Sequence, residues 1–167
     1  MLDSLIHPTQ TGFVKDRSIL DNIFTFWEAV SLARLRGEHM AVLLLDFEKA
    51  YDRVDWAFLE ATMLQMGFPE SWVRGVATLY RSAHSQVLLA GDRGERFSIS
   101  RSVWQGCPLA PTLFLFFAEA MSSFLTAQDT GLQGLRLPSR EEELLDSEFA
   151  DDTTAYLHGH EANLVCS

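Results

Sequence analysis

Three aspartates stand where short apolar segments end. Asp46 follows the run Ala41–Leu45, and the adjacent pair Asp151 and Asp152 follows Phe149-Ala150. An ionised carboxylate beside apolar residues is costly to bury unless a cation or a hydrogen-bond donor compensates its charge. If the two segments are neighbouring strands, the three carboxylates converge, and ligation by oxygen alone suits Mg²⁺ or Mn²⁺. Because Mg²⁺ completes its shell with water and phosphate oxygens, we expect a phosphate ester or nucleotide as substrate.

Two such ions, about 3.5–4 Å apart, would stabilise both the attacking and the leaving oxygen of a phosphoryl transfer. The same pattern also has a purely structural explanation. Aspartate pairs are frequent in turns, and an aspartate at the end of a strand often caps the element that follows. The aspartates by themselves therefore leave a metal site and a structural role both open.

The overall charge argues against a free-standing nucleic-acid binder. The 167 residues carry 13 Lys and Arg against 23 Asp and Glu, a net charge of −10, whereas such binders are usually basic. Seven acids and no base lie within residues 141–152, and the first three of them predict a solvated loop. A hydrophobic content of 47% indicates a packed domain rather than disorder. No apolar run approaches the roughly 20 residues of a membrane helix.

Helices and strands alternate along the chain. Ser18 followed by Asp21 predicts the start of a helix that ends at Gly37. The run Ala41–Leu45 predicts a strand buried on both faces. The remaining pattern predicts helices over 55–67 and 69–80, a hairpin of 85–90 and 95–100 around the turn 91–94, a loop over 104–111, a helix over 112–125 and two short strands within 147–156. Interleaved helices and a small sheet indicate an α/β or α+β domain.

Other residues are candidates for the same chemistry. Tyr51, five residues after Asp46, would stand near the aspartates or simply pack in the core. The turn Gln105-Gly106-Cys-Pro carries an amide that both donates and accepts, which suits reading a base or sugar edge as well as a structural turn. Four basic residues would contact phosphates or lie on the solvated surface: Lys15, Arg17, Lys49 and Arg53.

Taken in this order, these segments resemble the reverse transcriptase of LINE-type (non-LTR) retrotransposons. Residues 7–23 are similar to the fingers-to-palm segment around Gln-x-Gly-Phe…Arg-Ser, and residues 44–54 to palm motif A. Residues 103–111 resemble motif B, and Phe149-Ala-Asp-Asp resembles motif C, the acidic box of polymerases. The resemblance covers about residues 5–160.

The resemblance implies an α+β polymerase palm, with a small antiparallel ferredoxin- or RRM-like sheet packed on helices, and part of the fingers. It implies a single partial reverse transcriptase domain over 1–167, with a fingers-to-palm segment at about 5–40, a palm at 41–160 and no thumb. Most of the basic surface that grips template and primer would then belong to fingers and thumb. This expectation reconciles an acidic chain with a nucleic-acid substrate.

The resemblance also implies the reaction. Asp46 and Asp151 would bind two Mg²⁺ ions, or Mn²⁺, with help from the backbone carbonyl of Phe47, and Asp152 would complete the acidic site. A primer 3′-hydroxyl would attack the α-phosphate of a dNTP, with RNA as template and DNA as primer. Such an enzyme would act inside the cell, without a membrane, and in the nucleus if it belongs to a working element.

Three further residues receive roles from the same resemblance. Tyr51 would be the steric gate that favours deoxynucleotides, and Gln105 and Gly106 would line the pocket for the incoming nucleotide and the template base. Two positions depart from the family pattern. Lys15-Asp16 stands where relatives often have Pro-Gly, and Phe149 replaces the more common tyrosine.

Two other functions fit the residues. A receiver-like phosphoacceptor domain also uses a strand-end aspartate such as Asp46, an acidic pair and Mg²⁺. Its acidic pair is expected on the first strand, however, whereas here the pair comes last. A palm that has lost catalysis would serve only as a folded interaction module, which the three intact aspartates argue against.

Overall fold

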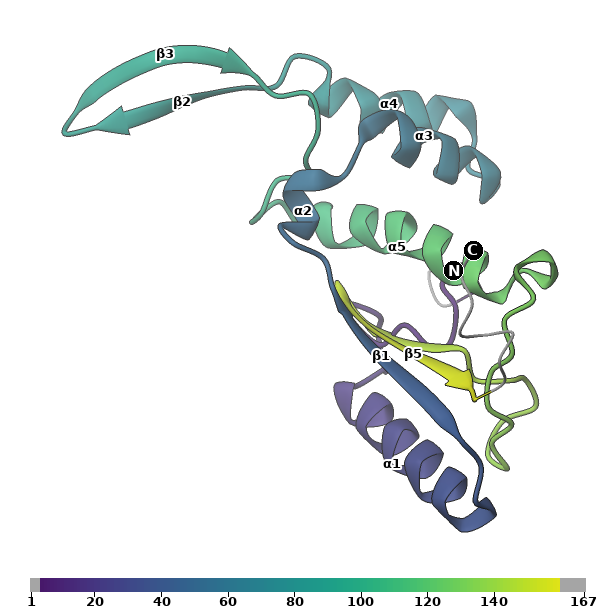
Figure 1. The fold of residues 1–167 in the computed structure, drawn as a ribbon. Helices are drawn as coiled ribbons and strands as arrows, with labels where there is room; N and C mark the ends of the chain where they lie inside the picture. The colour runs from purple at the N-terminus through teal and green to yellow at the C-terminus, as the bar shows by residue number, and fades with distance from the viewer. Residues whose placement is uncertain (1–3, 160–167) are drawn as a thin grey trace. The chain divides into compact units, whose positions relative to one another are not determined.

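The computed structural model describes residues 4–159, which form two compact units (Figure 1). The first unit comprises residues 4–48 and 118–159, and the second comprises residues 49–117. Helix α5 (Ala110–Thr126) begins in the second unit and ends in the first. Among the described residues, no helix combines the length and the apolar character needed to cross a membrane. The boundary predicted near residue 40 between fingers segment and palm stays a prediction.

A three-stranded antiparallel sheet forms the centre of the first unit. Its strand order is β1 (Met40–Asp46), β5 (Asp152–His158), β4 (Asp146–Phe149). Helix α1 (Ile19–Arg36) packs on this sheet (Figure 1). The shared core consists of Ala29, Leu135, Leu137, Leu144 and Tyr156. The α+β class is confirmed, and the antiparallel sheet excludes a receiver-like domain, which needs a parallel doubly wound sheet.

Helix α1 begins and ends where the sequence predicts. The Ser18 hydroxyl accepts a hydrogen bond from the Leu20 N–H (3.2 Å), while the Asp21 carboxylate accepts one from the Ser18 N–H (2.8 Å). This reciprocal capping box satisfies N–H groups that the helix itself leaves unpaired. At the other end, Gly37 adopts φ +66°, and its N–H bonds to the Arg34 carbonyl (3.3 Å).

Strand β1 is not buried on both faces, contrary to the prediction. Leu43, Leu44 and Leu45 are exposed, and Leu44 keeps 78% of its surface. A continuous apolar run is typical of a central parallel strand, but β1 lies at the edge of an antiparallel sheet. In this position only its first residues, Met40 and Val42, pack against the core.

The second unit contains three helices before a hairpin: α2 (Ala50–Arg53), α3 (Trp56–Gln65) and α4 (Glu70–Tyr80). As predicted, Asp55 caps α3, because its side chain accepts a hydrogen bond from the Phe58 N–H (3.0 Å). Pro69 is the N-cap of α4 rather than part of its first turn. The sequence did not predict α2, which has only four residues and follows Lys49 in a left-handed conformation (φ +55°) without a side-chain cap.

The hairpin of β2 (His84–Leu89) and β3 (Asp92–Ser98) extends away from α3 and α4 (Figure 1). Its turn is shorter than predicted, because Leu89 pairs directly with Asp92. The two turn residues, Ala90 and Gly91, have φ +50° and +93°. Positive φ at both central residues matches the right-handed twist of the flanking strands, which explains why a two-residue turn suffices.

The helix predicted over 112–125 corresponds to α5, which begins two residues earlier and ends one residue later. Residues 114–117 of α5 make several of the aromatic contacts of the second unit. Phe116 lies 4.9 Å from the Phe68 ring and Phe117 lies 5.2 Å from the Phe58 ring, measured between ring centroids. Phe114 and Phe116 are both buried.

Candidate metal-binding site at one end of the sheet

The pairing of β1 with β5 brings two of the predicted aspartates together. The antiparallel register runs from Met40 opposite His158 to Asp46 opposite Asp152. Directly opposite residues project to the same face of a sheet, with β-carbons roughly 4.5–5.5 Å apart. The two strands are therefore neighbours, which was the condition for the carboxylates to converge. Asp46 and Asp152 are both exposed to solvent. Phe47, whose carbonyl is the predicted fourth ligand, follows Asp46 directly and is half-buried.

The third aspartate lies in the turn between β4 and β5. Phe149 pairs with Asp152, so Ala150 and the half-buried Asp151 form a two-residue turn. None of the ion pairs within residues 4–159 involves Asp46, Asp151 or Asp152. The three negative charges at this end of the sheet therefore have no basic side chain to compensate them.

This donor set fits a hard divalent cation, because it offers only oxygen atoms, from the three carboxylates and the Phe47 carbonyl. Over residues 4–159, no three acidic, histidine or cysteine side chains are grouped so that they could hold a metal ion, and the expected convergence of all three carboxylates is therefore not seen. The site is instead an exposed cross-strand pair with Asp151 beside it in the chain. Such an open arrangement leaves coordination positions for water and phosphate oxygens, which Mg²⁺ retains in proteins.

Residues 9–11 run alongside the outer edge of β4, next to the turn between β4 and β5. The Glu148 N–H donates to the Thr9 carbonyl (2.9 Å), and the Thr11 N–H donates to the Glu148 carbonyl (2.8 Å). Arg17 fixes this segment from its other side, because its guanidinium donates to the carbonyls of His7 (2.6 Å) and Gln10 (2.7 Å). The side chain predicted to contact phosphate thus binds the protein's own backbone.

The two lysines predicted to contact phosphates have exposed side chains. Lys15 lies 3.8 Å from the Asp16 carboxylate, and both side chains are 85% exposed. Asp16 adopts φ +61°, a conformation that aspartate tolerates better than most residues, so it can stand where the resemblance implies a glycine. Lys49 is exposed in the second unit. Their contacts with nucleic acid stay a prediction.

Gly12 approaches the turn so closely that no side chain fits there. A β-carbon at this position would lie 2.3 Å from the Ala150 backbone nitrogen. We therefore expect Gly12→Ala to lower the free energy of unfolding by about 3 kcal/mol, since backbone atoms must shift to relieve the overlap. Urea denaturation of the purified chain measures this change.

Gly75→Ala is the matched control for this substitution. Gly75 lies within α4, and a β-carbon there would meet nothing within 4 Å. Alanine in a helix should stabilise this position by roughly 0.5–1 kcal/mol. A Gly12→Ala chain as stable as the unsubstituted one would contradict the close approach.

Two buried acids beside this turn were not recognised from the sequence. Asp146 and Glu148 are each 1% exposed and lie two residues apart on β4. Burial, together with the nearby Asp146 and Glu119, raises the pKa of Glu148 to about 9. Burial also raises the pKa of Asp146 and that of Glu119. Burial thus shifts all three carboxyl groups toward the protonated form.

The second unit contains the residues expected to contact a nucleotide. The Tyr51 ring stacks on Phe114 at 4.9 Å with an interplanar angle of 8°, and the Tyr51 carbonyl accepts a hydrogen bond from the Val103 N–H (2.8 Å). Gln105 and Gly106 are exposed in a tight turn, with Gly106 at φ +86°. Tyr51 is thus held rigidly by packing, while the amide of Gln105 is exposed.

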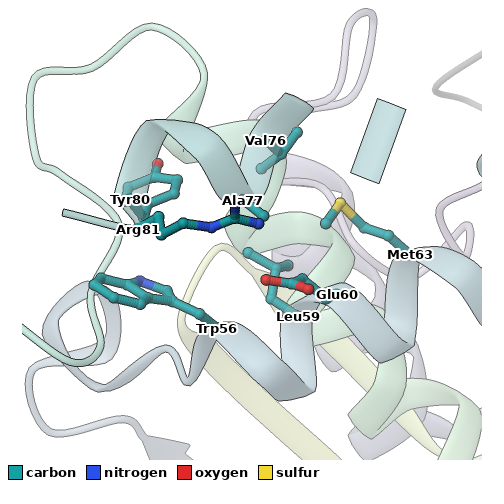
Figure 2. A pocket seen from close by; sticks show the side chains of 8 residues that line it. All are labelled: Trp56, Leu59, Glu60, Met63, Val76, Ala77, Tyr80 and Arg81. Atoms are coloured by element: carbon teal, nitrogen blue, oxygen red, sulfur yellow. The ribbon is translucent and has the colours of Figure 1, made fainter. Parts of the chain in front are cut away.

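A separate hollow lies between α3 and α4 (Figure 2). Its volume is about 210 Å³, and its lining is mostly apolar. Figure 2 shows side chains of both helices around it, among them Trp56, Met63 and Tyr80. Small-molecule pockets usually measure roughly 300–1,000 Å³, so this hollow is small for a ligand. It also contains none of the predicted site residues.

Residues 1–166 match the family model described as reverse transcriptase (RNA-dependent DNA polymerase). This chain belongs to the reverse transcriptase family. The transposon TX1 149 kDa protein of Xenopus laevis is 35% identical over 152 residues, which are 91% of this chain and 11% of that protein. The R2DM retrotransposable element polyprotein of Drosophila melanogaster is 28% identical over 107 residues, 64% of this chain and 10% of its own length. The predicted resemblance to LINE-type reverse transcriptases is confirmed.

Solved structures share the fold of this reverse transcriptase chain. Telomerase of Candida tropicalis, truncated from its C-terminal domain, superposes with a TM-score of 0.61 at 16% identity, covering 98% of this chain and 33% of that one. Telomerase of Candida albicans, in complex with a fragment of telomeric RNA, gives 0.57 at 14% identity over 88% of this chain and 27% of the other. The α+β palm-and-fingers architecture is therefore confirmed. Reverse transcriptases as a family generally use divalent metals, which the carboxylates at the end of the sheet fit.

Proposed function

We propose that this chain provides the catalytic palm of an RNA-directed DNA polymerase encoded by a LINE-type retrotransposon. The observation that carries the proposal is the register of Asp46 opposite Asp152, with Asp151 in the adjoining turn. In a chain of the reverse transcriptase family, these positions would be the aspartates of motifs A and C. Their charges lack a basic partner among the described residues, which supports a cationic ligand.

Asp46 and Asp151 would hold two Mg²⁺ or Mn²⁺ ions with the Phe47 carbonyl, and Asp152 would complete the acidic site. When bound, the two ions polarise the phosphoryl oxygens and lower the pKa of the attacking hydroxyl. The three carboxylates would hold the ions at the end of the sheet, where Asp46 and Asp152 are exposed and would be accessible to a primer 3′-hydroxyl and a dNTP. RNA would serve as template, and the nucleus would be the compartment of a working element.

The second unit would select the nucleotide. The stack on Phe114 keeps the Tyr51 ring from rotating freely, which suits a gate that excludes a ribose 2′-hydroxyl. Gln105 offers an exposed amide that both donates and accepts, and Gly106 lets the backbone approach a base closely. Lys15 and Lys49 would add contacts with template or primer phosphates.

Metal binding tests this proposal directly. We expect titration calorimetry to detect Mn²⁺ binding to the unsubstituted chain and none to the Asp46→Asn/Asp151→Asn chain. The matched control is Asp92→Asn on the β2–β3 hairpin, which should bind like the unsubstituted chain because Asp92 is exposed in another part of the chain. A folded chain that binds no Mn²⁺, or binding that survives the double substitution, would favour the alternative of a palm that acts only as an interaction module.

A further inference from the structure

We propose that Gln10 is a positioning residue, which fixes the turn that presents Asp151 and Asp152. The inference rests on the proposed function, because it takes these two aspartates to be metal ligands. Gln10 lies in the Gln-x-Gly-Phe segment near the N-terminus, 140 residues before Ala150. The sequence alone offers no reason to connect the two segments.

The Gln10 side chain uses its whole hydrogen-bonding capacity. Its Oε1 accepts from the N–H groups of Ala150 (2.9 Å) and Gly12 (2.8 Å). Its Nε2 donates to the Ala150 carbonyl (3.2 Å) and to Glu148 Oε2 (3.0 Å). Because an amide has two donors and two acceptor positions, all four are occupied, and the reversed amide would face donors with donors. Only one orientation of the side chain therefore fits the turn.

The backbone that Gln10 binds is strained. Ala150 adopts φ +57°, a region that costs a non-glycine residue roughly 1–2 kcal/mol. One side chain holds both the N–H and the carbonyl of this residue, directly before Asp151. Without Gln10, both backbone groups would lose their partner, and the turn would relax toward a conformation with negative φ. The direction of the Asp151 carboxylate would change with it.

Gln10 itself is held rigidly. It is 1% exposed, and its carbonyl accepts a hydrogen bond from Arg17 (2.7 Å). Its neighbours Thr9 and Thr11 both bond to the backbone of Glu148. Gly12 completes the contact, because the absence of a β-carbon lets the segment approach Ala150. The Gln-x-Gly element and Arg17 thus form one support for the turn, and Gln10 is its contact with the site.

The test measures Mn²⁺ affinity and local hydrogen exchange on the full 167-residue chain. Gln10→Ala removes all four side-chain bonds, and Gln10→Glu keeps the volume but replaces the donating nitrogen by oxygen. Gln65→Ala, an exposed position of α3, is the matched control. Calorimetry gives the Mn²⁺ affinity, and exchange is followed for the Ala150 N–H and for the Tyr156 N–H, which bonds to the Leu145 carbonyl (2.8 Å).

We expect both Gln10 substitutions to weaken Mn²⁺ binding about 10- to 100-fold, the range found when a group that orients metal ligands is removed. Exchange of the Ala150 N–H should accelerate while that of Tyr156 stays protected, and Gln65→Ala should change neither. Equal acceleration at both amides would reveal a purely structural role and overturn the inference. Unchanged Mn²⁺ affinity in both Gln10 variants would overturn the role of Gln10 and leave the proposed function standing. Failure of the unsubstituted chain to bind Mn²⁺ would refute the proposed function as well.

Discussion

Asp151→Asn is expected to reduce RNA-templated primer extension by about a thousandfold or more, with the fold intact. The substitution replaces a carboxylate by a neutral amide and so removes one negative charge from the acidic site. An amide is also a far weaker ligand for a divalent cation than a carboxylate. Lewis-acid stabilisation of a phosphoryl transition state is worth several kcal/mol, and about 4 kcal/mol corresponds to a factor of a thousand. The loss should fall on kcat, measured with saturating dNTP on a primed RNA template.

Non-additivity distinguishes a shared metal site from independent contributions. Asp46 and Asp152 face each other across two strands, and Asp151 adjoins them. When several residues act as a unit, substitution of the first one removes nearly all of the enzyme's activity. Asp46→Asn/Asp151→Asn should therefore be little worse than either single variant. Extension by Asp151→Asn within tenfold of the unsubstituted chain would show that this carboxylate is not catalytic, and Asp92→Asn controls for loss of an exposed charge.

Glu148→Gln is expected to stabilise the chain increasingly as the pH rises from 5 to 8. Burial raises the pKa of Glu148 to about 9, compared with 4.5 for an ordinary glutamate. Between these values the folded chain retains a proton that the unfolded chain has lost, so the free energy of unfolding falls as the pH rises. Each such group lowers it by about 1 kcal/mol per pH unit.

Glutamine is the neutral isostere of the protonated side chain. It removes this titration and still offers an oxygen to the Nε2 of Gln10, which now donates to Glu148 Oε2. The two chains should be about equally stable at pH 5, and the variant should gain about 1 kcal/mol for each unit above it. Asp146 and Glu119, whose pKa values are also raised, should leave a shallower decline with pH in the variant.

Urea denaturation at several pH values measures these curves. Glu141→Gln is the matched control, because Glu141 is an exposed acid a few residues earlier in the same segment. Its curve should parallel that of the unsubstituted chain. If Glu148→Gln leaves the slope of the free energy of unfolding between pH 5 and 8 unchanged, Glu148 is ionised in the folded chain. That result would contradict a raised pKa for Glu148.

Local signals fixed the ends of several elements. Two helices begin or end at caps formed by Ser18 with Asp21, by Gly37 and by Asp55. Each cap bonds to backbone groups within four residues, so a short stretch of sequence is enough to predict it. The hairpin around Gly91 follows from the same kind of signal. Helix α2 was not predicted, because four residues are too few to show a helical period of apolar side chains and Lys49 offers no capping side chain.

Burial was misjudged where it depended on the sheet order. The leucines of β1 have the composition of a central strand, yet an edge position leaves them exposed. No burial was predicted for Asp146 and Glu148, yet β4 lies between β5 and residues 9–11, which bury both side chains. In both cases the neighbouring strand, rather than the residue type, decides which side chain meets water.

The sequence by itself determined the family and indicated the three aspartates of the proposed site, because motif residues and their order are properties of the chain. Only the tertiary structure decided that Asp46 stands opposite Asp152 and that Gln10 holds the turn before Asp151. These contacts join residues more than 100 positions apart. Strand register and the close approach at Gly12 create them, and both depend on how the whole unit packs rather than on any local pattern.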